Sequence, residues 1–262
     1  MSTNKTTIGV LMIVKNEQKH LAACLDSVKG WVDEIVIVDS GSDDNTEQIA
    51  RQYTDKFIAQ HDWQGFGKQR QFAQQQMSSD WILPLDADER VSDELKNSIL
   101  AAVQNNPSNT CYSLNRLTYA LGKFIRHSGW YPDKIIRLYP RQATQYNDAL
   151  VHESVIVPKN FEVQHLQGDL LHYTFDSLTQ YRNKTALYMK SWTDQREGKK
   201  SASLGSAIAH GLFRFIKMYI IKRGFLDGRH GLLLAILSAN TTFTRYADLW
   251  LREYMKKQQS KK

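Results

Sequence analysis

The chain has 262 residues, and its 42% hydrophobic content can form the core of one α/β domain with an appendage, which excludes a disordered chain. The formal net charge of +7 favours an anionic partner, whether nucleic acid, acidic lipid headgroups or a phosphorylated substrate. Cys24 and Cys111, the only cysteines, lie far apart in the sequence and predict neither a disulfide framework nor a zinc site. We expect both to be reduced packing residues in a cytosolic protein.

The N-terminal segment predicts a strand rather than a signal peptide. It is polar as far as Thr7, and the apolar run 8–14 then enters Lys15-Asn16-Glu17 with no small-residue cleavage site. No later window reaches the roughly 20 apolar residues that cross a bilayer. Basic residues between His210 and Arg223 interrupt the best candidate. We therefore expect a chain that does not span a membrane.

Short β-branched runs alternate with helical segments over the first hundred residues. The pattern predicts strands at 8–14, 34–38, 56–59 and 81–85, and helices at 18–28, 46–53 and 67–77. Such alternation predicts an α/β fold whose sheet is mostly parallel and covered by helices on both faces. The turn from Asp39 to Thr46 is rich in helix-capping residues, so we expect it to form a nucleotide cradle at the sheet edge.

The second half of the chain reads differently. A helix at 92–103 and a loop at 105–109 precede strands at 111–117, 134–139 and 151–157 that alternate as antiparallel strands do. Asp176 is the predicted N-cap of the next helix, and 196–201 is the best linker candidate.

The segment from Leu204 onward predicts a basic amphipathic helix. One face of this helix is apolar and consists of Ile208, Leu212, Phe215, Ile216 and Tyr219. The opposite face is basic and consists of His210, Arg214 and Lys217. Such a helix either lies in a membrane interface or packs on the main domain.

Two apolar strands end in aspartate, one at Asp39 and the other at Asp86-Ala87-Asp88. Open α/β sheets bind ligands beyond the carboxyl ends of their strands, which favours an enzyme that uses an activated, phosphate-linked donor. Residues two apart on a strand share a face, so Asp86 and Asp88 are candidate ligands for Mg²⁺ or Mn²⁺ bridging a diphosphate. The alternative is a solvated turn of acids that leads into the helix at Ser92.

The segments Val14 to Glu17, Asp39 to Thr46 and Asp80 to Glu89 together resemble the nucleotide-binding half of the family 2 glycosyltransferases, which adopt the GT-A fold. Later segments further resemble the branch that adds β-linked glucose to the heptose of the lipopolysaccharide inner core. These are Trp130 to Lys134, Val151-His152-Glu153, His172-Tyr173 and Gly224 to Gly228.

The resemblance implies roles for the donor-side residues. Asp39, Asn16 and Glu17 are expected to contact the uridine and ribose, while Asp86 and Asp88 hold the metal and the sugar diphosphate. Helix capping is the alternative for Glu17 and Asp39.

The late histidine His172 resembles the one that often completes the metal site of GT-A enzymes, since a neutral imidazole can supplement two carboxylates. A satisfied core histidine is its alternative. Lys68 and Arg70, on the helix before the metal strand, are candidates to meet the diphosphate or are simply solvated.

An inverting transfer needs a general base on the acceptor hydroxyl. The resemblance places it in an acidic motif after the metal motif, where Glu153 fits, although the sequence departs from the common Glu-Asp form of that motif. Asp133 and Asp148 are rivals, and a surface salt bridge is the alternative for each. The aromatic residues Trp130, Tyr131 and Tyr139 are candidates for an acceptor pocket or for ordinary core packing.

The sequence thus predicts a GT-A catalytic domain at 1–200, with a nucleotide-sugar-binding half at 1–105 and an acceptor-binding half at 106–200, followed by a basic amphipathic helical tail at 201–262. We expect a cytoplasmic, metal-dependent, inverting hexosyltransferase, peripheral on the inner face of the membrane, that moves glucose from UDP-glucose to a heptose of a lipid-linked core oligosaccharide. The basic tail would be attracted by anionic lipid.

Two other functions compete with this one. A sugar nucleotidyltransferase would also pair a nucleotide-binding sheet with carboxylate-bound metal, but the loop at Lys15 lacks the glycine-rich, basic character of those enzymes. A basic nucleic-acid-binding protein is opposed by the absence of zinc-finger, RNP-like or helix-turn-helix signals, so no nucleic-acid partner is expected.

Overall fold

The computed structural model describes residues 5–104, 107, 109–150 and 153–259. They form two compact units: residues up to Arg116 together with Asp133–His172, and Leu117–Pro132 together with the chain from Tyr173 onward. This division differs from the predicted boundary at residue 200, because the helix after Tyr173 belongs with the C-terminal helices and not with the sheet.

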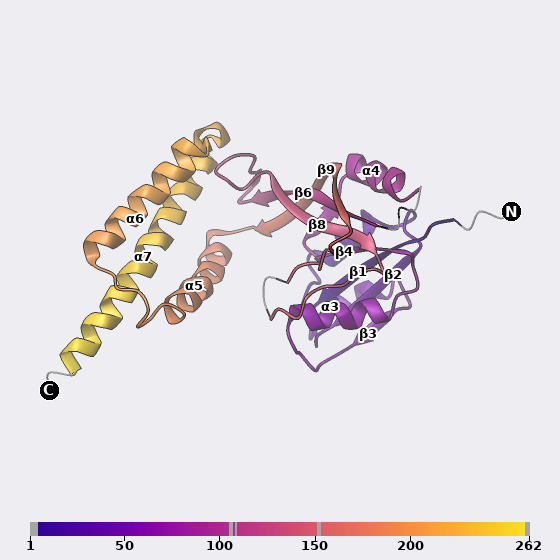
Figure 1. The fold of residues 1–262 in the computed structure, drawn as a ribbon, viewed down its shortest axis with the longest axis horizontal. Helices are drawn as coiled ribbons and strands as arrows, with labels where there is room; N and C mark the ends of the chain where they lie inside the picture. Colours follow the sequence, from indigo (N-terminus) through magenta and orange to yellow (C-terminus); the bar gives the residue numbers. More distant parts are fainter. Residues whose placement is uncertain (1–4, 105–106, 108, 151–152, 260–262) are drawn as a thin grey trace. The chain divides into compact units, whose positions relative to one another are not determined.

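The first unit is built on a sheet whose strands follow the order β3-β2-β1-β4-β8-β6-β9-β5 (Figure 1). The parallel part consists of β1 (Ile8–Val14), β2 (Glu34–Asp39), β3 (Phe57–Ala59) and β4 (Trp81–Leu85). The antiparallel part consists of β5 (Glu89–Val91), β6 (Thr110–Ala120), β8 (Asp133–Pro140) and β9 (Glu162–Phe175). A two-residue strand, β7 (Lys123–Phe124), pairs with the C-terminal end of β6, and both of these segments belong to the second unit.

Both faces of the parallel part are buried, which explains why β1 and β4 are apolar at nearly every position. Alternate residues of β1 enter different cores: Val10 and Met12 lie with helices α1 (Leu21–Asp26) and α4 (Asp93–Gln104), whereas Leu11 lies with α3 (Phe66–Gln75). Cys24 and Cys111 are buried free thiols in these two separate cores, which confirms their prediction as packing residues. A short helix, α2 (Thr46–Ala50), follows β2.

One strand expectation about this unit was wrong, and two strands were missed. Residues 153–157 form no strand, and only Val155 makes an isolated bridge, to Tyr146; Val151 and His152 lie outside the described residues. β5 was missed because three residues are too few to show a period. β9 was missed because its first four residues are exposed and only Val163 among them is apolar, so no apolar alternation marks its start.

The second unit is mainly helical. It contains α5 (Leu178–Asp194), α6 (Leu204–Ile216), the π-helical turn η1 (Lys217–Ile221), the 3-10 turn η2 (Gly224–Asp227) and α7 (Arg229–Gln259). The N-cap of α5 is Ser177, whose Oγ accepts a hydrogen bond from Gln180 N at 3.2 Å, and not Asp176 as predicted.

Asp227 fixes a turn inside the second unit. Its carboxylate is buried and accepts hydrogen bonds from the backbone N–H groups of Arg126 (3.1 Å) and His127 (3.0 Å) and from the Ser128 hydroxyl (3.3 Å). The Gly224 to Gly228 segment is therefore used to hold the turn that precedes Trp130.

Candidate active site

The carboxyl ends of β1, β2 and β4 lie at one edge of the sheet. Val14 pairs with Asp39 and Met12 pairs with Leu85, so the residues that follow each strand emerge side by side. The sequence predicted this edge as the donor site, and the structure brings the predicted residues of all three strands to it.

The loop after β1 is joined to the loop after β2 by hydrogen bonds. Asn16, in the left-handed region at φ 57°, donates from its backbone N–H to Ser42 Oγ at 2.8 Å and accepts from Asp43 N at 2.9 Å through its side chain. Glu17 N donates to Thr46 Oγ1 at 2.8 Å. Asparagine tolerates this backbone region better than most residues, which gives it a conformational role here.

Asp39 shapes its own loop. The carboxylate is buried, with Oδ2 accepting from the N–H groups of Gly41 (3.0 Å) and Ser42 (2.9 Å) and Oδ1 accepting from the Ser42 hydroxyl. Asp39 therefore orders the loop after β2 and does not cap α2, whose N-cap is Asn45. Its contact with uridine, like those of Asn16 and Glu17, stays a prediction.

Asp86 lies between two buried arginines. Its Oδ1 accepts from Arg70 Nη2 at 2.5 Å and its Oδ2 accepts from Arg137 Nη2 at 2.9 Å. Burial alone would raise the pKa of the Asp86 carboxyl, but Arg137 and Arg70 outweigh burial and hold that pKa well below its usual range. Asp86 is thus an anion fixed by two guanidinium groups.

Arg70 connects Asp86 to the candidate base. It is only 2% exposed, and its Nε donates to Glu153 Oε1 at 3.0 Å while its guanidinium lies 5.1 Å from the centre of the Tyr146 ring. Its Nη1 is buried and has no hydrogen-bond partner among the residues that the structure describes. The alternative that Arg70 is a solvated surface residue is therefore wrong. Lys68 is exposed and pairs with Asp148 at 2.9 Å.

Glu89 adds a third carboxyl to this cluster. It is fully buried, accepts from Asp86 N at 2.9 Å through Oε2, and accepts from Arg137 Nη2 at 3.3 Å through Oε1. Burial raises the pKa of Glu89 above its usual value. Neither Glu89 nor Arg137 was predicted; the only signal was an arginine within the apolar run 135–139 and a glutamate directly after the Asp86-Ala87-Asp88 motif.

Asp88 is paired with His172. The two residues meet because β5 pairs with β9, placing Glu89 opposite His172, and Asp88 Oδ2 then lies 3.3 Å from His172 Nε2. The Nδ1 of His172 is buried without a hydrogen-bond partner in the described part of the chain. Because His172 lies beside a carboxylate and its Nδ1 is unsatisfied among the described residues, its surroundings fit a metal ligand better than a satisfied core histidine.

Asp86 does not join Asp88 and His172, and no group of three metal-ligating side chains is found among the described residues. The reason is local: β4 ends at Leu85, so the alternation expected to aim Asp86 and Asp88 at one point stops before Asp86. That Asp86 binds a metal stays a prediction. It requires Asp86 to give up its contacts with Arg70 and Arg137 in favour of the cation.

The Asp88–His172 pair fits a divalent cation as two of its ligands. Neighbouring ligands of an octahedral cation with bonds of about 2.1 Å are about 3 Å apart, close to the observed 3.3 Å. One carboxylate oxygen and one imidazole nitrogen suit Mn²⁺, and substrate phosphates commonly complete such a site.

The three base candidates differ in their surroundings. Asp133 Oδ2 accepts from Arg116 Nε (2.9 Å) and Nη2 (2.8 Å), a two-point ion pair. Asp148 is exposed, and Lys68 lowers the pKa of its carboxyl together with a side-chain amide, so the surface-pair alternative holds for it. Glu153 is mostly buried and is the one bonded to the Asp86 cluster through Arg70.

The three aromatic residues predicted to form an acceptor pocket do not lie together. Tyr139 is fully buried in the core and donates from its hydroxyl to Gln74 Oε1 at 3.1 Å, so its assignment to an acceptor pocket was wrong. Trp130 packs on the core of the second unit, and Tyr131 lies beside Arg126 there.

The model of the family Glycosyl transferase family 2 matches residues 9–157. The chain belongs to this family. Among its relatives are a glycosyltransferase of Rickettsia typhi, 30% identical over 92% of this chain and 86% of that protein, and the lipopolysaccharide core biosynthesis glycosyltransferase LpsC of Rhizobium meliloti, 28% identical over 93% of this chain and 94% of that protein. Family membership confirms the predicted glycosyltransferase and its GT-A type α/β fold, and speaks against both competing functions.

A solved structure is also similar in part: glucosyl-3-phosphoglycerate synthase from Mycobacterium tuberculosis in complex with Mg²⁺ and uridine diphosphate. It shares 21% identity at a TM-score of 0.35, over 43% of this chain and 44% of that chain. This likeness covers too little of either chain to assign a role to any residue of this protein.

Proposed function

We propose that this family 2 glycosyltransferase moves a hexose, glucose from UDP-glucose, with inversion onto a heptose of the lipopolysaccharide inner core. The observation that carries the proposal is the similarity to LpsC over nearly the whole of both chains, since that relative is named for lipopolysaccharide core biosynthesis. This similarity extends past the donor half, which supports an acceptor of the lipopolysaccharide core.

The donor would bind at the carboxyl edge of the parallel strands. The joined loops after β1 and β2 offer a preformed wall for the nucleoside, because their polar groups are already satisfied by one another. Asp88 and His172 would hold Mn²⁺ or Mg²⁺, and this cation would neutralise the negative charge that develops on the departing diphosphate.

The base would be Glu153. It would accept the proton of the acceptor hydroxyl as that oxygen bonds to the anomeric carbon and the bond from that carbon to the diphosphate breaks. Arg70 orients this carboxylate from a buried position, which limits the freedom of the base and holds it near Asp86. Asp133 is the weaker candidate because its Oδ2 already accepts two bonds from Arg116.

The acceptor of this reaction is lipid-linked, so we also propose that the protein works in the cytoplasm as a peripheral protein on the inner face of the cytoplasmic membrane. Its positive net charge supports this placement, because the surface there is anionic.

A screen of UDP-sugars with Mn²⁺, read by thermal stabilisation and by slow donor hydrolysis, tests the donor site without the acceptor. A saturating donor at about a hundred times its Kd stabilises a protein by about 2.7 kcal/mol, which is readily measured. UDP-glucose should stabilise most, and chelation should remove the effect. Stabilisation by a non-uridine nucleotide alone would overturn the donor assignment.

A further inference from the structure

The outward side of α6 is apolar. Leu204, Ile208, Leu212 and Ile216, with Ile220 of η1, recur at every fourth position and are 44–62% exposed. Residues four apart lie above one another on a helix, so these five form a single continuous line, here called the α6 ridge. Phe213 and Ile221 beside it are equally exposed.

The other side of α6 packs on α7, which lies along it in Figure 1, through small residues. Ala207 and Gly211 are buried, and a Cβ added at Gly211 would lie 3.2 Å from Phe243 Cβ and 3.3 Å from Ala239 O. The two helices can approach this closely only because Gly211 has no side chain.

The polar side chains of α6 also turn towards α7. The His210 ring stacks on Tyr246 at 4.0 Å between centroids, and Arg214 Nε donates to Ser238 Oγ at 2.7 Å. A helix on the surface of a soluble domain normally places apolar residues inward and polar ones outward. Here the arrangement is reversed, so the α6 ridge faces away from the helix that covers the rest of α6.

The charge around the α6 ridge is almost purely positive. Between Glu197 and Asp248 the sequence has one acidic residue, Asp227, which is 2% exposed and bonded to the turn at 126–128. Exposed Lys217, Lys222 and Arg223 lie just past the C-terminal end of α6.

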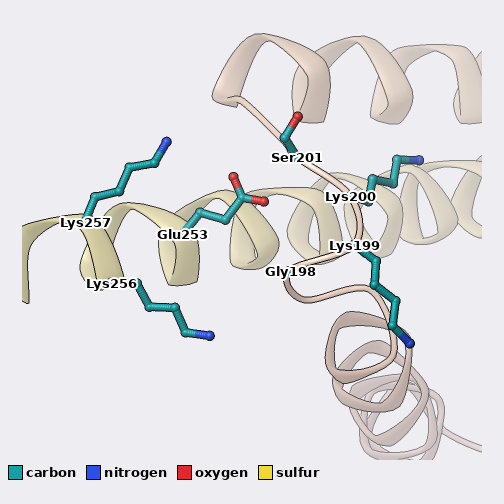
Figure 2. Close-up of a pocket in the computed structure, with 7 residues that line it drawn as sticks. All are labelled: Gly198, Lys199, Lys200, Ser201, Glu253, Lys256 and Lys257. Carbon is teal, nitrogen blue, oxygen red and sulfur yellow. The ribbon is translucent and has the colours of Figure 1, made fainter. Parts of the chain in front are cut away.

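The N-terminal end of α6 is basic as well. A hollow of about 360 Å³ lies there, lined by Gly198, Lys199, Lys200, Ser201, Glu253, Lys256 and Lys257. Figure 2 shows the lysines projecting around it from the linker before α6 and from the end of α7. Positive charge therefore flanks the apolar ridge at both ends.

We propose that the α6 ridge docks on the surface of a bilayer containing anionic phospholipid, with α6 lying in the plane of the interface. Exposed apolar side chains would enter the acyl boundary, and the lysines and arginines at both ends would meet lipid phosphates. The proposal deepens, and rests on, the peripheral placement proposed above by naming the surface that makes the contact.

A second copy of the chain suits the α6 ridge poorly. Pairing two ridges, parallel or antiparallel, would bring ends rich in lysine against each other, with Glu253 as the one acid among the residues that line the basic hollow, and this like charge opposes association. The bilayer supplies the missing negative charge.

A membrane-spanning helix suits it poorly too. Leu204–Ile221 is long and apolar enough to cross by length and composition, which the sequence expectation had excluded, and it is the one such stretch in the described residues. It nevertheless contains Arg214 and Lys217 and carries positive charge at both ends, whereas a spanning helix concentrates that charge on one side.

Vesicle flotation of the full chain tests the proposal. We expect binding to vesicles of phosphatidylethanolamine with phosphatidylglycerol and much weaker binding to pure phosphatidylcholine. Leu212→Gln with Phe213→Gln should lower partitioning at least tenfold, because two large apolar side chains no longer enter the lipid while glutamine preserves the helix. Lys217→Gln with Lys222→Gln should cost about fivefold per charge.

The matched control is Leu100→Gln with Val163→Gln, two exposed apolar residues of the other unit, which should bind as the wild type does. Wild-type protein that fails to float, a ridge variant that floats unchanged, a dimer that the ridge substitutions dissociate, or resistance to alkaline extraction would each overturn in-plane docking. Stabilisation by UDP should be unchanged in every variant. Wild-type protein that does not bind vesicles but is still stabilised by UDP rejects the docking surface alone, whereas wild-type protein that UDP does not stabilise rejects the proposed function.

Discussion

Replacing Arg70 by methionine should destabilise the protein by about 3 kcal/mol, although the substitution of a charged residue on a surface helix would usually be mild. The guanidinium is 2% exposed and bonds to Asp86 at 2.5 Å and to Glu153 at 3.0 Å. Removing one partner of a buried ion pair costs about 3–5 kcal/mol. We take the lower end because Asp86 keeps Arg137. Urea denaturation followed by tryptophan fluorescence should show a midpoint lower by roughly 1 M.

Lys68→Met is the matched control. Lys68 lies two residues earlier on α3 and pairs with Asp148 at 2.9 Å on the surface, so its loss should cost less than about 1 kcal/mol. In a Glu153→Gln background the Arg70→Met cost should shrink by about 1–2 kcal/mol, because one of the two buried carboxylates is already neutral. An Arg70→Met variant as stable as Lys68→Met would refute the assignment of Arg70 as the link within this cluster.

The other predictions concern single carboxyls. Asp88→Asn should leave the fold and its unfolding midpoint intact but abolish transfer and the Mn²⁺-dependent part of the UDP thermal shift; an unchanged Mn²⁺ dependence would contradict the cation site. Glu153→Gln should lower kcat about 10²–10⁴-fold with little change in donor KM, and Asp133→Asn less than tenfold; the reverse order in steady-state assays would identify Asp133 as the base. Glu34→Gln should cost about 1–2 kcal/mol at neutral pH, measured by urea denaturation across pH. Burial would raise the pKa of Glu34, but hydrogen bonds from Lys56 and Ser79 lower it from 4.5 to about 2. Because the folded pKa lies below the unfolded one, this stabilisation is complete above about pH 4.5 and disappears as the pH falls towards 2; solvent screening at half-exposed Lys56 reduces it from the roughly 3 kcal/mol that the shift alone implies. A Glu34→Gln deficit that grows on acidification would show the wrong sign.

The parallel part of the fold was predictable because its strands are buried on both faces. The runs 8–14 and 81–85 are nearly continuous apolar stretches, and β1 and β4 have those bounds in the structure. β9 was not predictable in this way. It is 14 residues long, but its opening segment is exposed and Gly168 interrupts its pattern, so its pairing partners and not its own sequence make it a strand.

The candidate site was predictable as a set of carboxylates at a strand edge, and not as a network. That His172 lies near Asp88 could be expected only from the resemblance. The two residues are 84 positions apart in the sequence, and it is the pairing of β5 with β9 that brings them together. Arg137 was missed because an arginine in a strand ordinarily marks a solvent-facing position. Only the three-dimensional neighbours Asp86 and Glu89 make its burial tolerable.

The α6 ridge shows the same limit in a helix. The sequence placed Ile208, Leu212 and Phe215 on one apolar face, which is correct as periodicity, yet the structure divides that face. Phe215 and Tyr219 pack on the inner core of the second unit, while Ile208 and Leu212 remain exposed. A helical period of 3.6 residues fixes which side chains are neighbours on the cylinder, but not which neighbours meet protein. Because α7 contacts the small and polar residues of α6 and leaves Leu204, Ile208, Leu212 and Ile216 exposed, these four side chains are the ones available to a surface outside the described residues.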